Sequence, residues 1–329
     1  MNNGLKIGIV GFGWWGQILA NYFREFEECE VTCVCKRRKD FPDEILCGAN
    51  YYSTFEEMFE KEEMDIAVIS TPPEIHYLPT KIAAEKKINI FCEKPMAHNV
   101  EDCERMIEVC EKNNVKLMIA FKHRFSKSFT YVKEKIEKLG KPLWAMYTYP
   151  LWKVEDPGWK FNEKGTKGII VENVVHAIDG LIYFFGDVER VYAEGNRVIF
   201  KHPTLPDSVV FTLRFKNGGI AGVGGGCTSD KRISQEYLDI HFEKGIAQIW
   251  GKLDYPLNLK ILYRNEDFPE EHYFEGSDGV KEEIKYFIDC IKGNKNPDIS
   301  DGKEGKKSLE VALAILKSIN ENKVIEIGG

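Results

Sequence analysis

The chain has 329 residues, of which 43% are hydrophobic, and a formal net charge of −7. This composition predicts a folded globular protein, long enough for a sizeable core and two domains. The negative charge would repel a nucleic-acid backbone, and no apolar run approaches the roughly 20 residues that span a bilayer. We therefore expect neither a nucleic-acid nor a membrane partner.

The N-terminal stretch MNNGLKIGIV lacks the charged lead and long apolar run of a secretion signal. The nine cysteines are scattered, and no CxxC pair occurs. An odd, unpatterned set of cysteines is typical of reduced thiols rather than of a disulfide framework. We expect a cytoplasmic protein.

The first 121 residues alternate short apolar runs with amphipathic stretches. Strands are predicted over residues 5–10, 30–35, 66–70, 88–93 and 116–121. Helices are predicted over residues 16–26, 54–62, 76–87 and 100–114. Strands that are apolar nearly throughout and separated by helices indicate an α/β fold, a doubly wound parallel (Rossmann) sheet. Such sheets bind ligands at the carboxyl ends of their strands.

The pattern changes after residue 122. Helices are predicted over residues 126–138, 169–185, 280–293 and 308–322. Strand-like stretches cover residues 142–152, 188–198, 208–215, 219–226, 237–243 and 247–250. This second half is typical of an α+β domain. We expect a dinucleotide-binding domain over residues 1–122 and a substrate-binding and oligomerisation domain over residues 123–329.

Residues 8–17, GIVGFGWWGQ, contain Gly11, Gly13 and Gly16 with GxGxxG spacing. The motif follows a predicted strand and opens a predicted helix, the context in which it binds a dinucleotide. Gly11 would allow the tight turn, Gly13 the approach of a pyrophosphate, and Gly16 close packing of helix on strand. An ordinary glycine-rich turn is the alternative.

Phe12, Trp14 and Trp15 stand between these glycines. Phosphates meet the backbone in such a turn, so large side chains fit here if they point away. We expect Trp15 to pack towards the sheet or the second domain, and Trp14 to edge the cleft near the nicotinamide.

The second predicted strand ends in Lys36, Arg37, Arg38 and Lys39, and the first carboxylate after it is Asp40. An acidic residue about 20 positions after the glycines binds the ribose 2′-hydroxyl of NAD, whereas a cation accepts the 2′-phosphate of NADP. We therefore expect NADP(H) rather than NAD(H), with Lys36 and Arg37 as ligands. A solvated basic turn is the alternative.

Lys94 lies in CEKPMA (residues 92–97), directly after a predicted strand and therefore at the ligand-binding edge of the sheet. Pro95 keeps Lys94 out of the helical region. The ammonium group would hydrogen-bond a substrate hydroxyl and stabilise the alkoxide that forms during hydride transfer. A surface lysine paired with Glu93 is the alternative.

Glu172, His176 and Asp179 fall at i, i+4 and i+7 of an otherwise apolar predicted helix, and so on one face of it. Buried charges need partners or a function. A histidine between two carboxylates suits general acid or base chemistry near neutral pH. The same three groups suit a divalent metal, but no fourth ligand has supporting spacing, and we expect no metal.

At this point the chain resembles the Gfo/Idh/MocA oxidoreductases, named for glucose–fructose oxidoreductase and inositol dehydrogenase. The resemblance covers nearly the whole length. It rests on GFGWWG (11–16), STPPEIHYL (70–78), CEKPMA (92–97), FKHRF (121–125), the ExxxHxxD helix (172–179) and the two closing helices.

The resemblance implies a Rossmann domain followed by a domain with a large open, mainly antiparallel sheet, often used for oligomer contacts. It also implies NAD(P)-dependent, reversible oxidation of a hydroxyl on a sugar, cyclitol or sugar nucleotide. We expect a homo-oligomer, a dimer or tetramer, that acts on a small polyhydroxylated substrate. A non-catalytic dinucleotide sensor of the same fold, and a metal-dependent lyase or hydrolase, are the rivals.

The resemblance also implies roles for residues at matching positions. Lys94 would contact substrate and nicotinamide, His176 would be the acid/base, and Asp179 would bind substrate hydroxyls or orient the histidine. Thr71, Pro72 and His76 would line the cofactor cleft, and Glu93 would hold the lysine strand. Many members have Asp where this chain has Glu172, and an acidic residue where it has Lys36. Residues 151–161 and 222–230 are candidates to line the substrate pocket.

Overall fold

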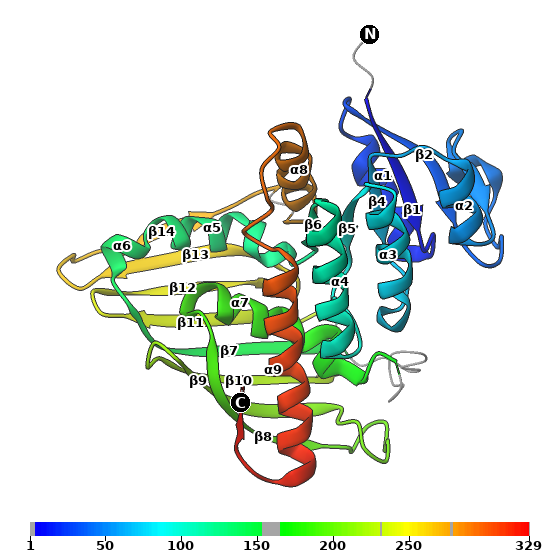
Figure 1. The fold of residues 1–329 in the computed structure, drawn as a ribbon. Helices are drawn as coiled ribbons and strands as arrows, with labels where there is room; N and C mark the ends of the chain where they lie inside the picture. The colour runs from blue at the N-terminus through cyan, green and yellow to red at the C-terminus, as the bar shows by residue number, and fades with distance from the viewer. Residues whose placement is uncertain (1–3, 153–164, 231, 277–278, 329) are drawn as a thin grey trace. The chain divides into compact units, whose positions relative to one another are not determined.

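The computed structural model describes residues 4–152, 165–230, 232–276 and 279–328. The chain forms two compact units (Figure 1). The first comprises Met1–Ala120 and Glu283–Lys306, and the second comprises Phe121–Glu282 and Lys307–Gly329. The N-terminal segment of the first unit ends at Ala120, two residues before the expected domain end at residue 122. Residues 283–306, expected in the second domain, belong to the first unit.

The first unit is built on a parallel sheet, six-stranded within the described residues, with the order β3-β2-β1-β4-β5-β6. Its strands are β1 (Leu5–Val10), β2 (Cys29–Cys35), β3 (Asn50–Tyr52), β4 (Ile66–Ile69), β5 (Asn89–Cys92) and β6 (Leu117–Ile119). The predicted doubly wound sheet is confirmed. The short strand β3 was not predicted, because three residues carry too little periodicity to be recognised.

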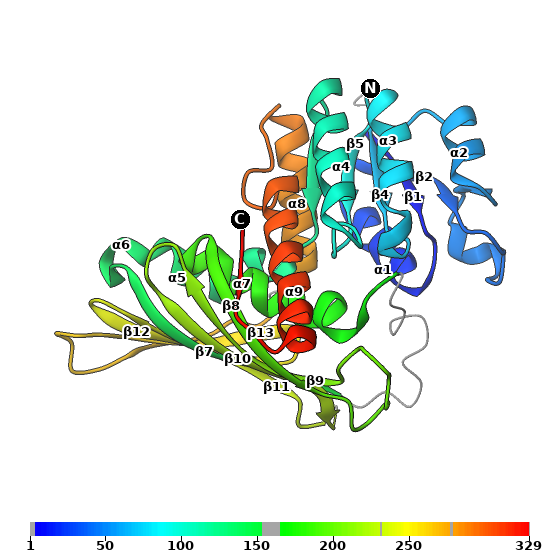
Figure 2. The same ribbon diagram turned by 60° about the horizontal axis from the view of Figure 1, so that its bottom comes forward.

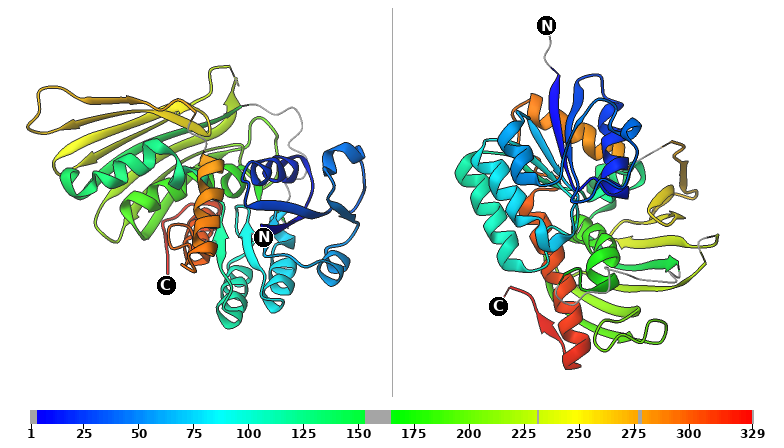
Figure 3. Two further views of the ribbon diagram at one scale, coloured as in Figure 1. Left: turned by 90° about the horizontal axis from the view of Figure 1, so that it is seen from above. Right: turned by 90° about the vertical axis from the view of Figure 1, so that its right-hand side faces the viewer.

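Helices cover both faces of this sheet (Figures 1 and 3). Their bounds are α1 (Trp14–Arg24), α2 (Phe55–Lys61), α3 (Tyr77–Glu85), α4 (Val100–Asn113) and α8 (Gly279–Lys292). Phe91 of β5 packs against Phe23 of α1 and Phe287 of α8, with ring centroids 5.8 Å apart in each pair. Therefore α1 and α8 share one face, and α2, α3 and α4 cover the other.

Capping residues set the ends of two of these helices. The Thr54 hydroxyl accepts from the backbone N–H of Glu57 at the start of α2, and Asn99 accepts from that of Asp102 at the start of α4. Both bonds satisfy amides that the helix itself leaves without a carbonyl. Asn114 ends α4 in the left-handed conformation, with φ +56°.

The second unit is built on a sheet that is nine-stranded within the described residues, ordered β14-β13-β12-β11-β7-β10-β9-β8-β15. Its strands are β7 (Pro142–Trp152), β8 (Val188–Asn196), β9 (Ser208–Phe215), β10 (Ile220–Ser229), β11 (Gln235–Phe242), β12 (Gly245–Lys252), β13 (Tyr255–Tyr263), β14 (Glu270–Tyr273) and β15 (Ile325–Glu326). Neighbours are antiparallel except β7 and β10. The expected open, mainly antiparallel sheet is confirmed.

Helices lie on one face of this second sheet (Figures 1 and 2). They are α5 (Lys127–Glu134), α6 (Ile136–Leu139), α7 (Val175–Phe185) and most of α9 (Gly302–Glu321). Side chains alternate accordingly: Val209 and Phe211 are buried, whereas Val210 between them is 65% exposed. The predicted helix over 126–138 is interrupted at Lys135, which gives two short helices.

None of the described helices is both long and apolar enough to cross a membrane. All nine cysteines are free thiols, and seven of them are buried. Burial raises the pKa of Cys33 and Cys35 to about 12, so these thiols act as small core side chains.

Candidate active site

The glycine loop joins β1 to α1 in the first unit. Gly11 has φ +99°, a conformation that favours glycine, and a Cβ there would lie 2.7 Å from the Ser70 backbone. A Cβ at Gly16 would collide with the carbonyl oxygen of Gly11. At Gly13, by contrast, a Cβ would meet no described atom within 4 Å. The loop is closed at Gly11 and Gly16 and open above Gly13, where a phosphate needs room.

The backbone amides of this loop divide into two groups. The N–H groups of Gly11 and Phe12 both donate to the carbonyl oxygen of Cys35, at 3.0 and 2.9 Å. Because α1 begins at Trp14, the N–H groups of its first turn have no helix carbonyl before them. Those amides and the positive end of the helix dipole suit a phosphate. The Phe12 side chain is fully buried and packs on Phe41, so it shapes the loop.

The two tryptophans differ in their surroundings. Trp14 is 77% exposed. The indole N–H of Trp15 donates to Glu93 Oε1 at 2.5 Å, and Glu93 Oε2 accepts from the backbone N–H of Lys94 at 3.2 Å. Trp15 therefore connects the start of α1 to the residue after β5, and the Glu93 side chain bonds both Trp15 and the backbone of Lys94.

Lys36 and Arg37 follow β2. The Lys36 ammonium pairs with Asp40 and lies 5.7 Å from the centroid of the Phe41 ring. Arg37 is exposed. The structure therefore places both candidate 2′-phosphate ligands after the strand, but with the Asp40 carboxylate beside Lys36, a contact that the sequence pattern did not reveal.

His76 connects the loops that follow β4 and β5. It is 1% exposed, and its Nε2 lies 2.7 Å from the Thr71 carbonyl oxygen while its Nδ1 lies 3.1 Å from that of Met96. Pro72 precedes a short 3-10 turn, Pro73–Ile75. The Thr71 hydroxyl oxygen is buried and has no hydrogen-bond partner among the described residues. His76 thus fixes the backbone, and the Thr71 hydroxyl is a group suited to a ligand.

The register of the parallel strands brings these candidates to one edge. Val10 of β1 pairs with Ile69 of β4, and Ile69 pairs with Cys92 of β5. The residues that follow, which include the glycine loop, Thr71 and Lys94, therefore leave the sheet at the same end. Lys94 is half-buried, and its peptide bond to Pro95 is cis. This is the edge where doubly wound sheets bind ligands.

The helix that bears His176 lies in the second unit, and its first turn differs from the α-helix that was predicted. Residues Ile170–Val174 form a π-helix, and the regular α-helix α7 starts at Val175. A π-turn bonds i to i+5 and is wider than an α-turn, so Glu172 does not take the i, i+4, i+7 alignment that was predicted. Only His176 and Asp179 share a regular helical face. All three side chains are buried, Asp179 completely.

Asp179 is held by groups of the protein. Arg124 donates from Nε and Nη2 to its two carboxylate oxygens at 2.9 and 2.8 Å, and the Ser308 hydroxyl donates to Oδ1 at 2.9 Å. The expectation allowed Asp179 either to bind substrate or to orient the histidine. Its burial and these three bonds anchor the helix one turn after His176.

Aromatic rings surround His176. Its ring centroid lies 5.3 Å from that of His123, 6.2 Å from Phe121 and 6.5 Å from Tyr149. The Tyr149 hydroxyl donates to Asp254 at 2.5 Å. The imidazole is therefore surrounded by aromatic rings, and one of these, Tyr149, is held in place by its hydrogen bond to Asp254.

The motif FKHRF (121–125) supports the family resemblance, but no role was predicted for its three basic residues. Each of them faces a carboxylate from a different element: Lys122 and Asp254 at 3.5 Å, His123 and Glu236 at 3.6 Å, Arg124 and Asp179 at 2.8 Å. One signal was available, since three basic residues between two apolar phenylalanines need partners if the segment is buried. Nothing local indicated which carboxylates those partners are.

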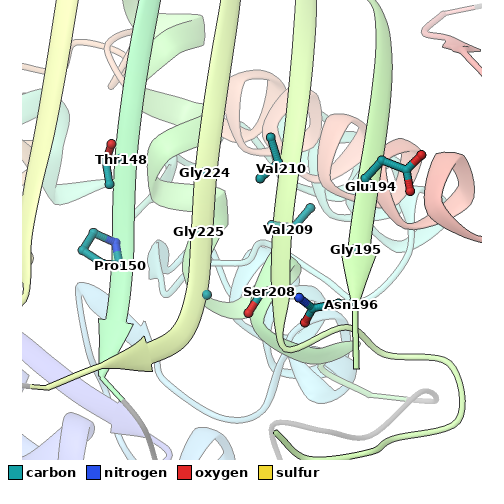
Figure 4. A pocket seen from close by; sticks show the side chains of 11 residues that line it. Thr148, Pro150, Glu194, Gly195, Asn196, Ser208, Val209, Val210, Gly224 and Gly225 are labelled. Atoms are coloured by element: carbon teal, nitrogen blue, oxygen red, sulfur yellow. The ribbon is translucent and has the colours of Figure 1, made fainter. Parts of the chain in front are cut away.

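Among the described residues, no group of three or more His, Cys, Asp or Glu side chains is arranged to hold a metal ion. A hollow of about 490 Å³ lies over β7, β8, β9 and β10 (Figure 4). Gly224–Gly226, part of the predicted 222–230 segment, line it, but none of the catalytic candidates does. Of the other predicted segment, residues 153–161 lie outside the described residues.

Comparison with known proteins agrees with this arrangement. Residues 5–121 match the oxidoreductase family with an NAD-binding Rossmann fold, and residues 129–248 match the GFO/IDH/MocA C-terminal domain. Myo-inositol 2-dehydrogenase of Thermotoga maritima is 26% identical and covers 98% of each chain. D-xylose 1-dehydrogenase [NADP(+)] of Haloarcula marismortui is 25% identical over 99% of this chain and 94% of its own.

The solved structure of levoglucosan dehydrogenase in complex with NADH and levoglucosan has the same fold. Its TM-score is 0.88 at 20% identity, covering 98% of this chain and 99% of the other. Both halves of the sequence, and the order in which they follow one another, thus have counterparts in one family. The chain belongs to the Gfo/Idh/MocA family of oxidoreductases.

Proposed function

We propose that this protein is an NAD(P)-dependent dehydrogenase or reductase that transfers hydride between the nicotinamide and a hydroxyl-bearing or keto carbon of a sugar, cyclitol or sugar nucleotide. The observation that supports this most is the glycine loop, open above Gly13 and followed by the first amides of α1, at the sheet edge that also bears Lys94. The named relatives act on myo-inositol and D-xylose, both small and polyhydroxylated.

The residues of the first unit would bind the dinucleotide. The space above Gly13 and the amides of the first turn of α1 fit a pyrophosphate, and the buried Thr71 hydroxyl offers a hydrogen bond. Phe12, Trp15, His76 and Glu93 would act indirectly, because their contacts hold the loops in place. Trp14, which is exposed, and Pro72, which follows Thr71 in the chain, would border the cofactor.

The chemistry would fall to Lys94 and His176. When bound, NAD(P) supplies or accepts a hydride at nicotinamide C4. In the oxidative direction His176 takes the hydroxyl proton of the substrate, and the Lys94 ammonium stabilises the developing oxyanion. Glu172 would help to bind the substrate hydroxyls, and Asp179 would hold the His176 helix through Arg124 and Ser308. Reduction uses the same groups in reverse.

For the cofactor we propose a preference for NADP(H) over NAD(H). The support is that Lys36 and Arg37 follow β2, where a 2′-phosphate would lie, and that a carboxylate is absent from the strand end itself. Asp40, which pairs with Lys36, would have to release it to the phosphate.

We also propose a cytoplasmic homo-oligomer, a dimer or tetramer. The face of the second sheet opposite its helices exposes apolar side chains such as Met146, Val210 and Ile220, at 54%, 65% and 46%. Contiguous exposed apolar surface of this kind is typical of contacts between subunits. Light scattering on the purified protein measures the mass; a monomer would contradict this proposal.

One experiment tests the activity. NADPH or NADH is titrated by fluorescence, and the protein is then assayed for turnover on a panel that includes myo-inositol, D-xylose and nucleotide sugars. Binding followed by turnover is the expected result. Binding without turnover on any member of a broad panel would favour a dinucleotide sensor, and activity that a chelator abolishes would favour a metal-dependent enzyme.

A further inference from the structure

A second histidine–carboxyl pair lies beside His176. His123, in the 3-10 turn Lys122–Phe125, and Glu236, on β11, are each 1% exposed. His123 Nε2 lies 3.6 Å from Glu236 Oε1. The proposed reaction uses neither residue, although the ring centroid of His123 lies 5.3 Å from that of His176.

The hydrogen bonds around Glu236 define its two oxygens differently. The Tyr147 hydroxyl donates to Oε2 at 3.3 Å. Oε1 is buried and has no hydrogen-bond partner among the described residues, and neither has Nε2 of His123. An ionised carboxylate would leave a charged oxygen buried without a donor, which is costly. A proton on Oε1 removes that charge, and Oε1 faces Nε2 of His123 at 3.6 Å, just beyond hydrogen-bond length.

The electrostatic environment acts in the same direction. Burial is the largest influence on both groups: it raises the pKa of Glu236 well above its ordinary range, with the Asp254 charge adding to the effect, and lowers the pKa of His123 to about 4. The other titratable groups facing the pair are Lys122, Tyr147, Tyr149 and His176. Burial therefore favours the uncharged form of both members of the pair.

The orientation of His123 matters because of its neighbours. Its ring stacks on Phe129, with centroids 5.4 Å apart and planes 23° apart, and its centroid lies 5.3 Å from that of His176. A positive charge on His123 would oppose the protonated form of His176. A neutral His123 leaves His176 free to take up a proton.

We propose that Glu236 is a positioning residue, a protonated carboxylic acid that keeps the His123 ring in place without adding a charge beside it, so that His176 exchanges its proton beside an uncharged ring. The inference rests on the proposed acid/base role of His176. It assigns to Glu236 the function of a neutral polar group rather than that of a charge.

The test compares Glu236→Gln with Glu236→Ala by NMR titration of the histidine ring signals. His123→Asn and His176→Asn assign the two signals. Gln keeps the shape and a donor without the charge, so the parent pattern should persist: the His123 signal stays constant from pH 8 to pH 5. Ala admits water and removes the donor, so His123 should titrate within that range and the His176 signal should shift to a lower pH.

Turnover should follow the same order. Glu236→Gln should retain kcat within about threefold, whereas Glu236→Ala should lose about 10- to 100-fold, the effect of a misplaced catalytic group. Glu236→Leu, which removes the acid but fills more of its space, serves as a second variant if Glu236→Ala does not fold, and should reduce kcat in the same direction. A Gln variant as impaired as the Ala variant, or an Ala variant that moves neither signal, would overturn the inference.

The titration needs no substrate, so it is separable from the proposed function. If His176→Asn retained full turnover, the acid/base role would fail while the histidine signals still reported whether Glu236 holds His123. If His176→Asn abolished turnover and Glu236→Ala left both signals unchanged, only the inference about Glu236 would fail.

Discussion

Arg124 and Asp179 form a buried, two-pronged ion pair, with donor–acceptor distances of 2.9 and 2.8 Å and side-chain exposures of 3% and 0%. Arg124 is the fourth residue of the second unit, and Asp179 lies one helical turn after His176. The pair therefore links the start of the unit to the helix that bears the proposed acid/base.

Arg124→Ala should destabilise the protein strongly, because it leaves the Asp179 carboxylate buried and without its guanidinium. We expect a loss of about 3–5 kcal/mol in the free energy of unfolding, measured with urea. The exposed pair Lys138–Glu266, 2.9 Å apart, is the control, and Lys138→Ala should cost far less than Arg124→Ala because solvent screens the pair. Equal losses from the two variants would show that Arg124 does not anchor the helix.

His176→Ala should abolish most turnover without weakening dinucleotide binding, because the histidine lies in the other unit from the glycine loop. A decrease in kcat of about 10²- to 10⁴-fold is expected for loss of a general acid/base. Fluorescence titration with NADPH checks the binding. His272→Ala, on β14, is the control and should leave kcat unchanged, so a similar loss in both variants would point to a general defect.

Gly13→Ala and Gly16→Ala should separate binding from folding. A methyl group fits at Gly13, where no described atom lies within 4 Å, but collides with the Gly11 carbonyl at Gly16. We expect Gly13→Ala to fold normally and to bind the dinucleotide at least about tenfold more weakly, a loss of ~1.4 kcal/mol. Gly16→Ala should lower the thermal unfolding temperature. Gly224→Ala, also in open space, controls for the loss of a glycine; unchanged binding by Gly13→Ala would exclude a phosphate there.

Lys36→Ala should weaken NADPH binding more than NADH binding. A hydrogen bond to a charged group contributes about 1.5–3 kcal/mol, so the ratio of the two dissociation constants should change by at least about tenfold. Lys39→Ala is the matched control, because Lys39 pairs with Asp43 in the same way that Lys36 pairs with Asp40. An unchanged ratio in Lys36→Ala would contradict the preference for NADP(H).

His123 should make the protein acid-sensitive. Its pKa in the folded state is about 4, below the 6.5 of an unperturbed histidine, because burial disfavours the charged ring. As the pH falls from about 6.5 to 4 the unfolded chain binds the proton first, so stability decreases, by at most about 3 kcal/mol from this group. Urea unfolding at several pH values should show a shallower decrease in His123→Asn than in the parent, and an equally steep decrease in the two proteins would contradict this account.

Local patterns account for the features of the first unit on which prediction and structure agree. The glycine spacing, the apolar strands and the position of Lys94 after a strand are all features of short segments, and a parallel sheet necessarily brings strand ends to one edge. The α-helix predicted from residue 169 is wrong over residues 170–174, because hydrophobic spacing does not distinguish a π-turn from an α-turn. The strands β3 and β15 were not predicted because they are too short to show periodicity, and no separate strands were predicted where β13 and β14 lie.

By itself the sequence determined the class of fold, the dinucleotide loop and the identity of the candidate acid/base. Only the tertiary structure decided which carboxylates are the partners of Lys122, His123 and Arg124. Arg124 and Asp179 are 55 residues apart in the chain, and Tyr147 and Glu236 are 89 apart, so no periodic pattern relates them. Their pairing follows from burial, because a buried polar group is stable only beside a partner, and the fold alone chooses which partner that is.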